Sequence, residues 1–361
     1  MSNLLTPAIL FGVLIAVTIL IILVDLVLGN NKQRAILING EKTIPVTSDD
    51  TLLNILSQNQ IFIPSACGGK ATCGFCKCTV TEGGGEIKPT ERPFIKDADV
   101  EKGVRLSCQV KVKDNMKIEI PSSMLTAKEY QTVIDEVRQL TYDIKLIRFK
   151  LIKPNRMDFK PGQYAQLKVP GIDVIRAYSI ASDPAITDSI EMIVRYVPNG
   201  QATTYVFKAL QKGDKATITG PYGSFFLQEQ STRDIVCIAG GSGKAPIRSI
   251  LARLKATGMQ RKVRYFFGAK AVRDLYYTEE MRQLEKEFPN FEYIPALSDP
   301  LDEDKWEGAT GLITDVLDRM TGDLKEAEAY LCGSPGMIDA CIKVLNKHDI
   351  KSENVFYDKF A

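Results

Sequence analysis

The sequence is almost devoid of histidine. His348 is the single histidine among 361 residues. Ser-His-Asp catalysis, Cys-His catalysis and metal sites with several histidine ligands are therefore hard to build from this chain. Because His348 lies close to the C-terminus, we expect it to be a solvated helix residue rather than a ligand.

The sequence also lacks a strong net charge. It has 46 Lys and Arg residues against 44 Asp and Glu residues, which leaves a net charge of +2. Such a balance provides neither a basic surface for nucleic acid nor an acidic tail, so we expect no nucleic-acid partner. A chain of 361 residues, 45% of them hydrophobic, predicts two or three domains with cores of their own.

One long apolar run stands near the N-terminus. Residues 8–28 contain a single charged side chain, Asp25, and about 20 helical residues are enough to cross a bilayer core of about 30 Å. No Lys or Arg precedes the run, whereas Lys32 and Arg34 follow it. By the positive-inside rule we predict that residues 1–31 are a single-pass anchor in the lipid bilayer of the inner (cytoplasmic) membrane. The N-terminus is then outside, and the catalytic domains are in the cytoplasm.

Residues 32–122 have the pattern of a small β-rich domain. Two short apolar stretches flank Asn39-Gly40, which is a strong signal for a type I′ hairpin. An amphipathic helix follows, and its N-terminal cap is predicted at Ser48 or Asp49. Further short strands surround this helix, so the sequence predicts a compact unit of the β-grasp type.

The remaining chain divides at about residue 230. Short strands at regular spacing over residues 126–229 predict an antiparallel β-barrel. Strands and helices alternate over residues 230–361, which predicts a doubly wound parallel sheet. The fold class is therefore expected to be a multi-domain α/β chain with an N-terminal transmembrane helix.

Half of the eight cysteines lie within residues 65–78. Three kinds of site could explain such crowding: a zinc knuckle, a disulfide framework or an iron–sulfur cluster. Disulfide frameworks favour small, loop-rich chains, and zinc ribbons usually pair two C-x2-C knuckles where this sequence has one. The sequence therefore favours a cluster in a reducing compartment.

The spacing of four cysteines is typical of a 2Fe–2S ferredoxin. Three lie on one tight loop with the spacing C-x5-C-x2-C, and the fourth lies beyond another pair of strands. Gly68, Gly69 and Gly74 allow this loop to turn with positive φ, so that backbone amides can point at sulfur atoms. We expect Cys78 on the strand that leaves the loop, and Cys237 in a core. The predicted cluster ligands are Cys67, Cys73, Cys76 and Cys108.

A second motif, R-A-Y-S, resembles the flavin-binding pattern of ferredoxin-reductase-type barrels. Arg176 can pair with a pyrophosphate oxygen, Tyr178 can cover one face of the flavin ring, and Ser179 can hydrogen-bond its N5 atom. The G-P-Y-G at 220–223 is either the loop that leaves the barrel or a plain turn. A predicted helix N-terminus offers amides and hydroxyls to a phosphate, and its residues are Gly200, Thr203 and Thr204.

The third motif is the glycine loop A-G-G-S-G-K-A-P between a strand and a helix. Gly240, Gly241 and Gly243 would let a pyrophosphate approach the backbone at the N-terminus of that helix. A glycine loop alone proves little. Its partner is a second strand that ends in Cys332-Gly333 before another helix, which is the arrangement of a dinucleotide-binding sheet.

Taken in order, these motifs resemble one family of electron-input subunits, those of the sodium-translocating NADH:quinone oxidoreductase. The segments that carry the resemblance are CGGKATCGFC, RAYS, GPYG, GGSGKAP, FFGAKAVRDLYY, ALSDP and CGSP, and they span nearly the whole chain. The resemblance implies that the four thiolates hold a 2Fe–2S cluster, that the flavin is FAD and that NADH is the hydride donor. It also implies that electrons pass from NADH through FAD to the cluster, and on to a quinone or to membrane-embedded subunits.

The same resemblance implies roles for residues near the C-terminus. In ferredoxin reductases a Cys-Gly pair at the end of this strand lies beside the nicotinamide, which assigns Cys332 and Gly333 to the NADH site. An aromatic ring often stacks on the flavin, and Phe360 stands where that ring would be, although plain packing explains it equally well. We expect Ser179 and Cys332 to be the catalytic residues.

Three features depart from the family pattern. The segment between Tyr164 and Arg176 lacks a longer insertion, Lys244 replaces an apolar residue, and C-G-S-P replaces C-G-P-P. The missing insertion bears on assembly into a sodium pump, whereas the flavin chemistry does not depend on it.

Two other functions fit parts of the sequence. An NADH-dependent reductase of a multicomponent oxygenase often has the same order of modules, although such reductases commonly have no anchor. An anchored ferredoxin-like carrier with vestigial nucleotide domains would not oxidise NADH. The sequence also leaves the choice between NADH and NADPH open. Lys270 and Arg273 could hold the 2′-phosphate of NADPH, whereas Asp274 could oppose one. All three residues could instead form a solvated loop. The resemblance favours NADH.

Overall fold

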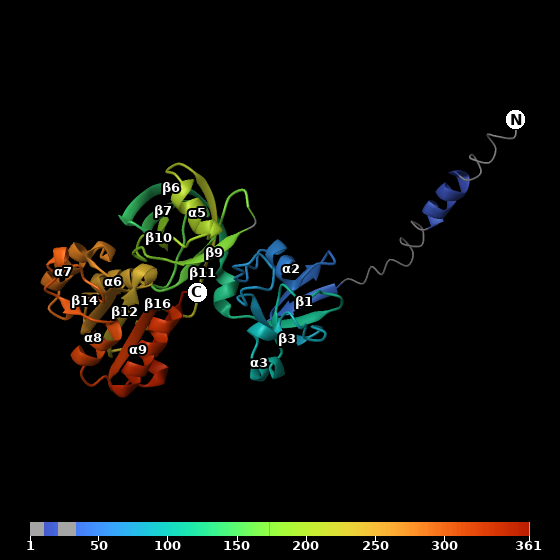
Figure 1. Cartoon of the computed structure of the whole chain (residues 1–361). Coiled ribbons are helices and arrows are strands. Elements are labelled where there is room, and N and C mark those ends of the chain that lie inside the picture. Colours follow the sequence, from blue (N-terminus) through green and yellow to red (C-terminus); the bar gives the residue numbers. More distant parts are fainter. Residues whose placement is uncertain (1–10, 21–33, 173, 361) are drawn as a thin grey trace.

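Three sheets follow one another along the chain and form three modules (Figure 1). The computed structural model describes residues 11–20, 34–172 and 174–360. Residues 11–20 are helical, but most of the predicted anchor lies outside the described residues. Within the described ranges, no helix combines the length and the apolar character needed to cross a bilayer.

The first module is a five-stranded mixed sheet in the order β2-β1-β5-β3-β4, with helix α2 packed against it. The predicted type I′ hairpin is confirmed, because β1 and β2 are joined through Asn39 and Gly40, whose φ angles of 51° and 72° are both positive. The elements of this module are β1 (Arg34–Ile38), β2 (Lys42–Val46), α2 (Leu52–Gln58), β3 (Lys77–Glu82), α3 (Asp97–Glu101), β4 (Val104–Leu106) and β5 (Met116–Glu119).

Helix α2 begins later than the sequence predicts. Its N-cap is Thr51, whose side-chain oxygen accepts a hydrogen bond of 3.3 Å from the amide of Asn54. The prediction of Ser48 or Asp49 is wrong because Thr51 still pairs with Lys111 in an antiparallel bridge, and the chain turns into a helix only beyond it. The helix then buries its apolar face in the core of the module, through Leu52, Leu53, Ile55 and Leu56.

The second module is an antiparallel sheet of six strands in the order β10-β7-β6-β11-β8-β9. A bridge between Ile180 and Met192 joins the two ends of this order, so the sheet curls into a barrel around its own core. The elements are α4 (Ser122–Thr126), β6 (Lys128–Thr141), β7 (Ile144–Lys153), β8 (Tyr164–Lys168), β9 (Ile175–Ser179), β10 (Ser189–Arg195), α5 (Gln201–Lys208) and β11 (Lys215–Tyr222).

The third module contains the predicted parallel sheet, which is confirmed, with six strands in the order β15-β14-β13-β12-β16-β17. Helices α6 and α7 pack on one face of this sheet, and α8 and α9 pack on the other. The strands are β12 (Asp234–Gly240), β13 (Val263–Ala269), β14 (Phe291–Leu297), β15 (Ala309–Thr310), β16 (Ala327–Gly333) and β17 (Val355–Lys359). The helices are α6 (Lys244–Ala256), α7 (Thr278–Glu287), α8 (Ile313–Met320) and α9 (Pro335–Lys347).

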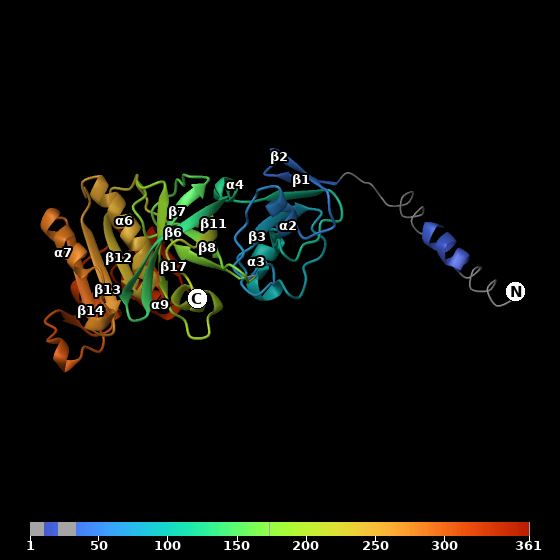
Figure 2. The same ribbon diagram turned by 90° about the horizontal axis from the view of Figure 1, so that it is seen from above.

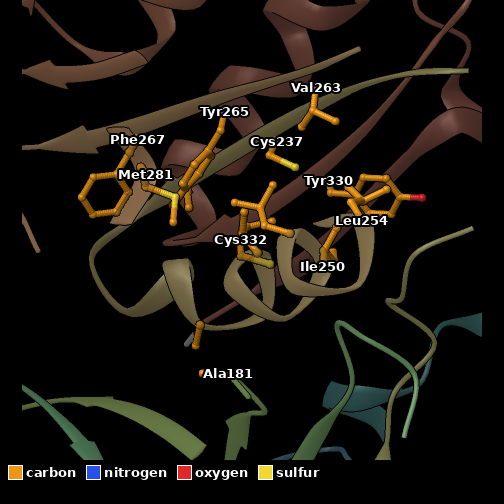
Figure 3. Packing of buried hydrophobic residues seen from close by; sticks show 14 of the residues in the cluster. Ala181, Cys237, Ile250, Leu254, Val263, Tyr265, Phe267, Met281, Tyr330 and Cys332 are labelled. Carbon is orange, nitrogen blue, oxygen red and sulfur yellow. The ribbon is translucent and has the colours of Figure 1, made fainter. Parts of the chain in front are cut away.

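The core between the sheet and α6 contains two of the cysteines (Figure 3). Cys237 on β12 is fully buried, as predicted, and lies in the same cluster as Cys332 on β16. Aromatic side chains of the neighbouring strands, such as Tyr265 and Tyr330, surround them. Burial raises the pKa of both thiols, which favours their protonated form.

The prediction of a solvated His348 is wrong. His348 is the C-cap of α9, and its Nε2 atom lies 2.8 Å from a carboxylate oxygen of Asp318 on α8. Its side chain is 18% exposed, because α8 and α9 pack side by side on the same face of the sheet. The histidine therefore links the ends of two helices.

Candidate functional site

The four predicted cluster ligands are divided into two pairs. The Cys73 thiol lies 3.4 Å from the sulfur of Cys67, and Cys76 and Cys108 lie close enough for each thiol to shift the pKa of the other. Three of these residues come from the loop between α2 and β3, and Cys108 follows β4. Within the described residues, no group of three or more His, Cys, Asp or Glu side chains is gathered around a point where one metal ion could sit.

The loop turns its backbone amides toward the sulfur atoms. Burial alone would raise the pKa of Cys67, but hydrogen bonds from the Thr72 amide, the Cys73 thiol, the Thr72 hydroxyl and the Lys70 amide outweigh burial and lower this pKa to about 7. The hydrogen bond from Cys76, opposed by burial, lowers the pKa of Cys108 to about 6. One thiol of each pair is therefore poised to ionise, which is the form that binds iron.

Glycine is required where the loop is tightest. A Cβ atom on Gly74, whose φ is +68°, would lie 2.7 Å from the ring of Phe94. Four thiols in two pairs, with amide donors around them, fit a 2Fe–2S cluster in which each iron takes one pair. We conclude that the residues present suit the group that the cysteine spacing predicts.

A buried ion pair supports the strand next to the cluster loop. Arg105 on β4 donates to the carboxylate of Glu91 at 2.7 Å, and the two side chains are 7% and 0% exposed. The amide of Leu106 also donates to Glu91, at 2.9 Å. Cys78 lies on β3 opposite Arg105 and is buried, so it is a strand residue as predicted. Burial raises the pKa of Cys78 to about 12.

The flavin motif lies on β9, at the border between the barrel and the cluster module. The guanidinium of Arg176 donates to the carbonyl oxygen of Ala66, one residue before Cys67. Tyr178 is half-buried, and burial raises its pKa to about 12. Ser179, the last residue of β9, is buried. The set comprises a guanidinium, a phenol ring and a hydroxyl, which suits the phosphates and the flat ring of a flavin nucleotide.

The predicted phosphate-binding turn of the barrel is present as the start of α5. Gly200 is its N-cap, and the amide of Thr204 donates to the carbonyl oxygen of Gly200 at 2.8 Å. The hydroxyl of Thr203 donates to the carbonyl oxygens of Val197 and Gly200, at 3.1 and 3.2 Å. The Thr203 side chain therefore holds its own turn, which leaves the Thr204 side chain and the amides for a phosphate.

The G-P-Y-G segment is neither a loop nor a plain turn at its start. Its first three residues complete β11, and Tyr222 is buried 5.6 Å, centroid to centroid, from the ring of Tyr164 on β8. A Cβ atom on Gly223 would lie 3.1 Å from the Tyr164 ring. The glycine is thus needed for the close approach of that tyrosine.

The two glycine motifs of the third module meet at the ends of neighbouring strands. Gly240 ends β12, Gly241–Gly243 form a 3-10 turn, and α6 follows at once. A Cβ atom on Gly243 would lie 2.2 Å from the carbonyl oxygen of Cys332. One on Gly333 would lie 2.5 Å from the side chain of Met337. Bare backbone at the N-terminus of α6 is the cradle that a dinucleotide pyrophosphate requires.

Strand β17 brings the C-terminal residues to the same place. The amide of Phe360 donates to the carbonyl oxygen of Gly333 at 2.8 Å, and the amide of Asp358 donates to the sulfur of Cys332. The Cys332 thiol is fully buried, so its backbone, rather than its sulfur, borders the glycine loop. Burial also raises the pKa of Asp358 to about 6.

Tyr164 on β8, which the sequence does not single out, lies within electrostatic range of groups from all three modules. Burial raises the pKa of this phenol, and the charges of Tyr222, Asp358 and Cys73 add to the shift. Tyr164 belongs to the barrel, and the shift in its pKa relates it to Asp358 on β17 and to the predicted cluster ligand Cys73; Figure 2 shows β8 and β17 near one another. Side chains alternate between the two faces of a strand, so the sequence places Tyr164 on the same face of β8 as Gln166. Which residues of the other modules lie near that face depends on the tertiary structure.

Comparisons with known families cover the three modules. Residues 36–113 match the 2Fe-2S iron-sulfur cluster binding domain. Residues 131–227 match the oxidoreductase FAD-binding domain, and residues 237–343 match the oxidoreductase NAD-binding domain.

Similar proteins span nearly the whole chain. A Na(+)-translocating NADH-quinone reductase subunit, the one designated F, of a Marinomonas strain is 35% identical over 98% of this chain and 98% of its own length. Its counterpart of the same designation in Klebsiella pneumoniae is 37% identical over 98% and 99%. Among solved structures, an Amycolatopsis cytochrome P450 reductase has a TM-score of 0.76 at 26% identity, covering 91% of this chain and 98% of its own. The ferredoxin reductase in carbazole 1,9a-dioxygenase has a TM-score of 0.70 at 25% identity, with the same coverage.

Proposed function

The chain belongs to the family of these Na(+)-translocating NADH-quinone reductase subunits, and from this premise we propose that it is the electron-input component of a membrane-bound quinone reductase. It is an NADH-dependent flavin and iron–sulfur oxidoreductase, in which electrons pass from NADH through FAD to a 2Fe–2S cluster. When bound, FAD takes up a hydride and the cluster takes up single electrons, which the side chains of the protein could not do. Our proposed domain limits are 32–122, 126–229 and 230–361.

The third module would bind NADH through backbone rather than through charged side chains. The bare backbone of Gly240, Gly241 and Gly243 would receive the pyrophosphate at the N-terminus of α6. Cys332 and Gly333 would border the nicotinamide, since the Cys332 carbonyl packs against Gly243 and the Gly333 carbonyl is held by Phe360. No histidine base is needed for this chemistry.

The barrel would hold FAD on β9 and α5. Arg176 would pair with the pyrophosphate, Tyr178 would cover the flavin ring and Ser179 would hydrogen-bond its N5 atom. Gly200 and Thr204 would offer further donors at the start of α5. Phe360, whose amide donates to the Gly333 carbonyl oxygen and whose half-buried side chain packs against the core of the third module, would lie against the other face of the ring.

The observation that carries the electron path is the convergence on Tyr164. Burial raises the pKa of Tyr164 most, and the charges of Asp358, at the dinucleotide end, and of Cys73, a predicted cluster ligand, raise it further. A flavin bound by β9 would stand next to both, since Tyr164 pairs with Ser179 in the barrel. The proximity of the three sites supports direct transfer along the chain of cofactors.

We propose that residues 1–31 anchor the protein in the inner membrane, with the N-terminus outside and the three modules in the cytoplasm. The apolar run 8–28 and the basic residues after it support this topology. The final acceptor is then a quinone, or a membrane-embedded subunit that reduces one. Coupling to sodium transport would require such subunits, because a single helix cannot form an ion path.

We propose NADH rather than NADPH as the donor. Lys270 forms an exposed ion pair with Asp299 at 3.6 Å, and the guanidinium of Arg273 lies 5.6 Å from the ring centroid of Tyr142. Asp274 accepts a hydrogen bond from the amide of Ala271 and so closes its own turn. These contacts support the interpretation as a surface loop rather than a 2′-phosphate site.

A second candidate function is the reduction of an oxygenase. Two solved structures that cover 91% of this chain are a cytochrome P450 reductase and the ferredoxin reductase in carbazole 1,9a-dioxygenase. The two candidates share every step up to the cluster and differ only in the acceptor. The anchor run at residues 8–28 favours the quinone-linked acceptor.

The test is an anaerobic titration of the full-length protein in lipid nanodiscs, with NADH and separately with NADPH. Flavin bleaching and the EPR signal of a reduced 2Fe–2S centre are followed together. We expect NADH to produce both signals, and a water-soluble quinone or the membrane fraction of the host to reoxidise them. Flavin bleaching without a cluster signal would refute the electron path, and no change in either would restore the carrier hypothesis.

A further inference from the structure

Lys244, the first residue of α6, is enclosed by aromatic side chains. It is 1% exposed, and its Nζ atom donates to the carbonyl oxygen of Tyr276 at 2.7 Å and to the hydroxyl of Tyr293 at 3.3 Å. The ring centroids of Phe267, Tyr276 and Tyr293 lie 3.9, 4.8 and 5.2 Å from Nζ, and that of Tyr265 lies 5.7 Å away. We call these four aromatic residues the lysine cage; Tyr265 and Phe267 are visible in Figure 3.

Several charged groups face this cage from the elements packed around it. The guanidinium of Arg282 on α7 lies 5.3 Å from the ring centroid of Tyr293, and Glu285 accepts a hydrogen bond of 2.6 Å from the Tyr293 amide. Asp143 and Arg195 of the barrel act on Tyr276.

Burial lowers the pKa of Lys244 to about 7, and the carboxylate of Glu280 on α7 opposes that shift. Glu280 also pairs with Arg248 of α6, at 3.3 Å. The hydroxyls of the cage and the thiols of Cys237 and Cys332 keep their protons, because burial raises their pKa values. A methionine at this position would avoid the free-energy cost of burying an ammonium group. The presence of a lysine therefore indicates a functional role.

The cage is joined directly to the glycine loop. Tyr276, whose backbone oxygen accepts from Lys244, uses its own hydroxyl to donate to the carbonyl oxygen of Gly241 at 2.7 Å. Gly241 has a φ of +54° and belongs to the turn that would receive a pyrophosphate. The Lys244 side chain thus contacts Tyr276, whose hydroxyl contacts the glycine loop, and Lys244 itself is 1% exposed.

We propose that Lys244 is a positioning residue for the dinucleotide, whose buried ammonium holds the Gly241–Gly243 turn through Tyr276 and adds positive charge beneath the pyrophosphate site. The inference rests on the proposed NADH site and deepens it. A cation here and the amides at the N-terminus of α6 both contribute positive electrostatic potential, which favours binding of an anion above the turn. Lys244 does not touch the ligand, since its Nζ atom is sealed inside the cage.

The test is steady-state kinetics of the full-length holoenzyme with NADH and ferricyanide, comparing wild type, Lys244→Met, Tyr276→Phe and the double variant. We expect Lys244→Met to raise KM for NADH about tenfold, with kcat changed less than about twofold. Tyr276→Phe removes one oxygen atom and should raise KM by several-fold, and its effect should not add to that of Lys244→Met. Lys255→Met, on the exposed side of α6, is the matched control and should leave KM unchanged.

A pH profile separates charge from packing. Protonated Lys244 favours the anionic ligand, so KM of the wild type should rise as pH increases through about 7, whereas Lys244→Met should lack that rise. An unchanged KM in both Lys244→Met and Tyr276→Phe, or identical pH profiles, would overturn the inference. If the wild type itself fails to oxidise NADH, the proposed function fails instead. If Lys244→Met does not fold, Tyr276→Phe decides alone.

Discussion

The guanidinium of Arg176 donates a hydrogen bond of 2.7 Å to the carbonyl oxygen of Ala66. Ala66 immediately precedes the predicted cluster ligand Cys67, and Arg176 begins the flavin motif, so one contact joins the two candidate cofactor sites. A second contact runs in parallel, from the amide of Ser65 to the side-chain oxygen of Gln166 on β8, at 3.3 Å. The position of the cluster loop relative to the flavin is therefore set by side chains of the barrel.

Arg176→Ala should slow electron transfer to the cluster. Losing the contact lets the loop shift relative to the flavin, and a displacement of about 1 Å can reduce a rate by tenfold or more. Because Arg176 is also a candidate FAD ligand, the experiment is done with excess FAD by anaerobic stopped flow, which follows flavin and cluster separately. Arg156→Ala, which breaks an exposed ion pair with Asp158 on the barrel, should change neither phase. An unchanged cluster phase in Arg176→Ala would mean that the contact has no part in the transfer.

Removing a cluster thiol should abolish the cluster and spare the flavin. Cys76→Ala or Cys108→Ala breaks one of the two pairs, so iron, labile sulfide and the EPR signal should be lost while FAD content stays normal. Cys78→Ala is the matched control, because Cys78 is a buried strand residue. It should retain the cluster and cost about 1 kcal/mol of stability. Loss of iron in Cys78→Ala would make Cys78 a ligand after all.

Breaking the ion pair next to the cluster loop should destabilise the first module. Glu91→Ala leaves the buried guanidinium of Arg105 uncompensated, which costs about 3–5 kcal/mol. The denaturant concentration that bleaches the cluster should fall accordingly. Glu82→Ala, which removes an exposed partner of Lys117, should cost less than about 1 kcal/mol.

The same pair predicts a pH dependence. Burial alone would raise the pKa of Glu91, but hydrogen bonds from Arg105 and from the Lys88 and Leu106 amides hold it below its usual value. The contribution of Glu91 to stability is therefore complete above the unfolded pKa of about 4.3 and is lost as the pH falls through the lower folded value. The stability gap between wild type and Glu91→Ala should close in acid and stay constant near neutrality. A gap that persists in acid would contradict this account.

Gly243→Ala should block reduction of the protein by NADH but not its reduction by dithionite. Its Cβ atom would lie 2.2 Å from the Cys332 carbonyl oxygen, which is backbone and cannot move aside. We expect kcat/KM for NADH to fall about 100-fold or more, while dithionite still reduces flavin and cluster. Gly322→Ala, where no described atom lies within 4 Å of the new Cβ, should behave as wild type. Normal NADH oxidation by Gly243→Ala would place the dinucleotide elsewhere.

The sequence predicted the features that local pattern determines. The Asn39-Gly40 turn, the alternation that produces the parallel sheet and the spacing of the four cysteines each lie within a short stretch. The N-cap of α2 was misplaced because Thr51 pairs with Lys111 across the fold. The exposure of His348 is mispredicted for a similar reason, since its partner Asp318 comes from another helix.

The candidate site was predictable as motifs but not as a meeting point. Glycine loops and the R-A-Y-S strand are readable in the sequence, yet nothing local indicates that Tyr164 is within electrostatic range of both the predicted cluster ligand Cys73 and Asp358 on β17. The sequence shows that Lys244 departs from the apolar residue of the family pattern, but the aromatic residues that enclose it come from β13, β14 and the turn before α7. Such relationships depend on side chains that are distant in sequence, and only the folded chain brings them together.

The order of the modules gives the protein a direction. In the proposed path, electrons enter at the C-terminal module and move toward the N-terminal module, which is opposite to the direction of the sequence. The cluster module begins at Arg34, directly after the predicted anchor. A tether this short would keep the exit of the pathway at the lipid surface, at an effective concentration on the order of millimolar toward a membrane acceptor. Covalent connection would thus replace a docking step that a free carrier must repeat for every electron.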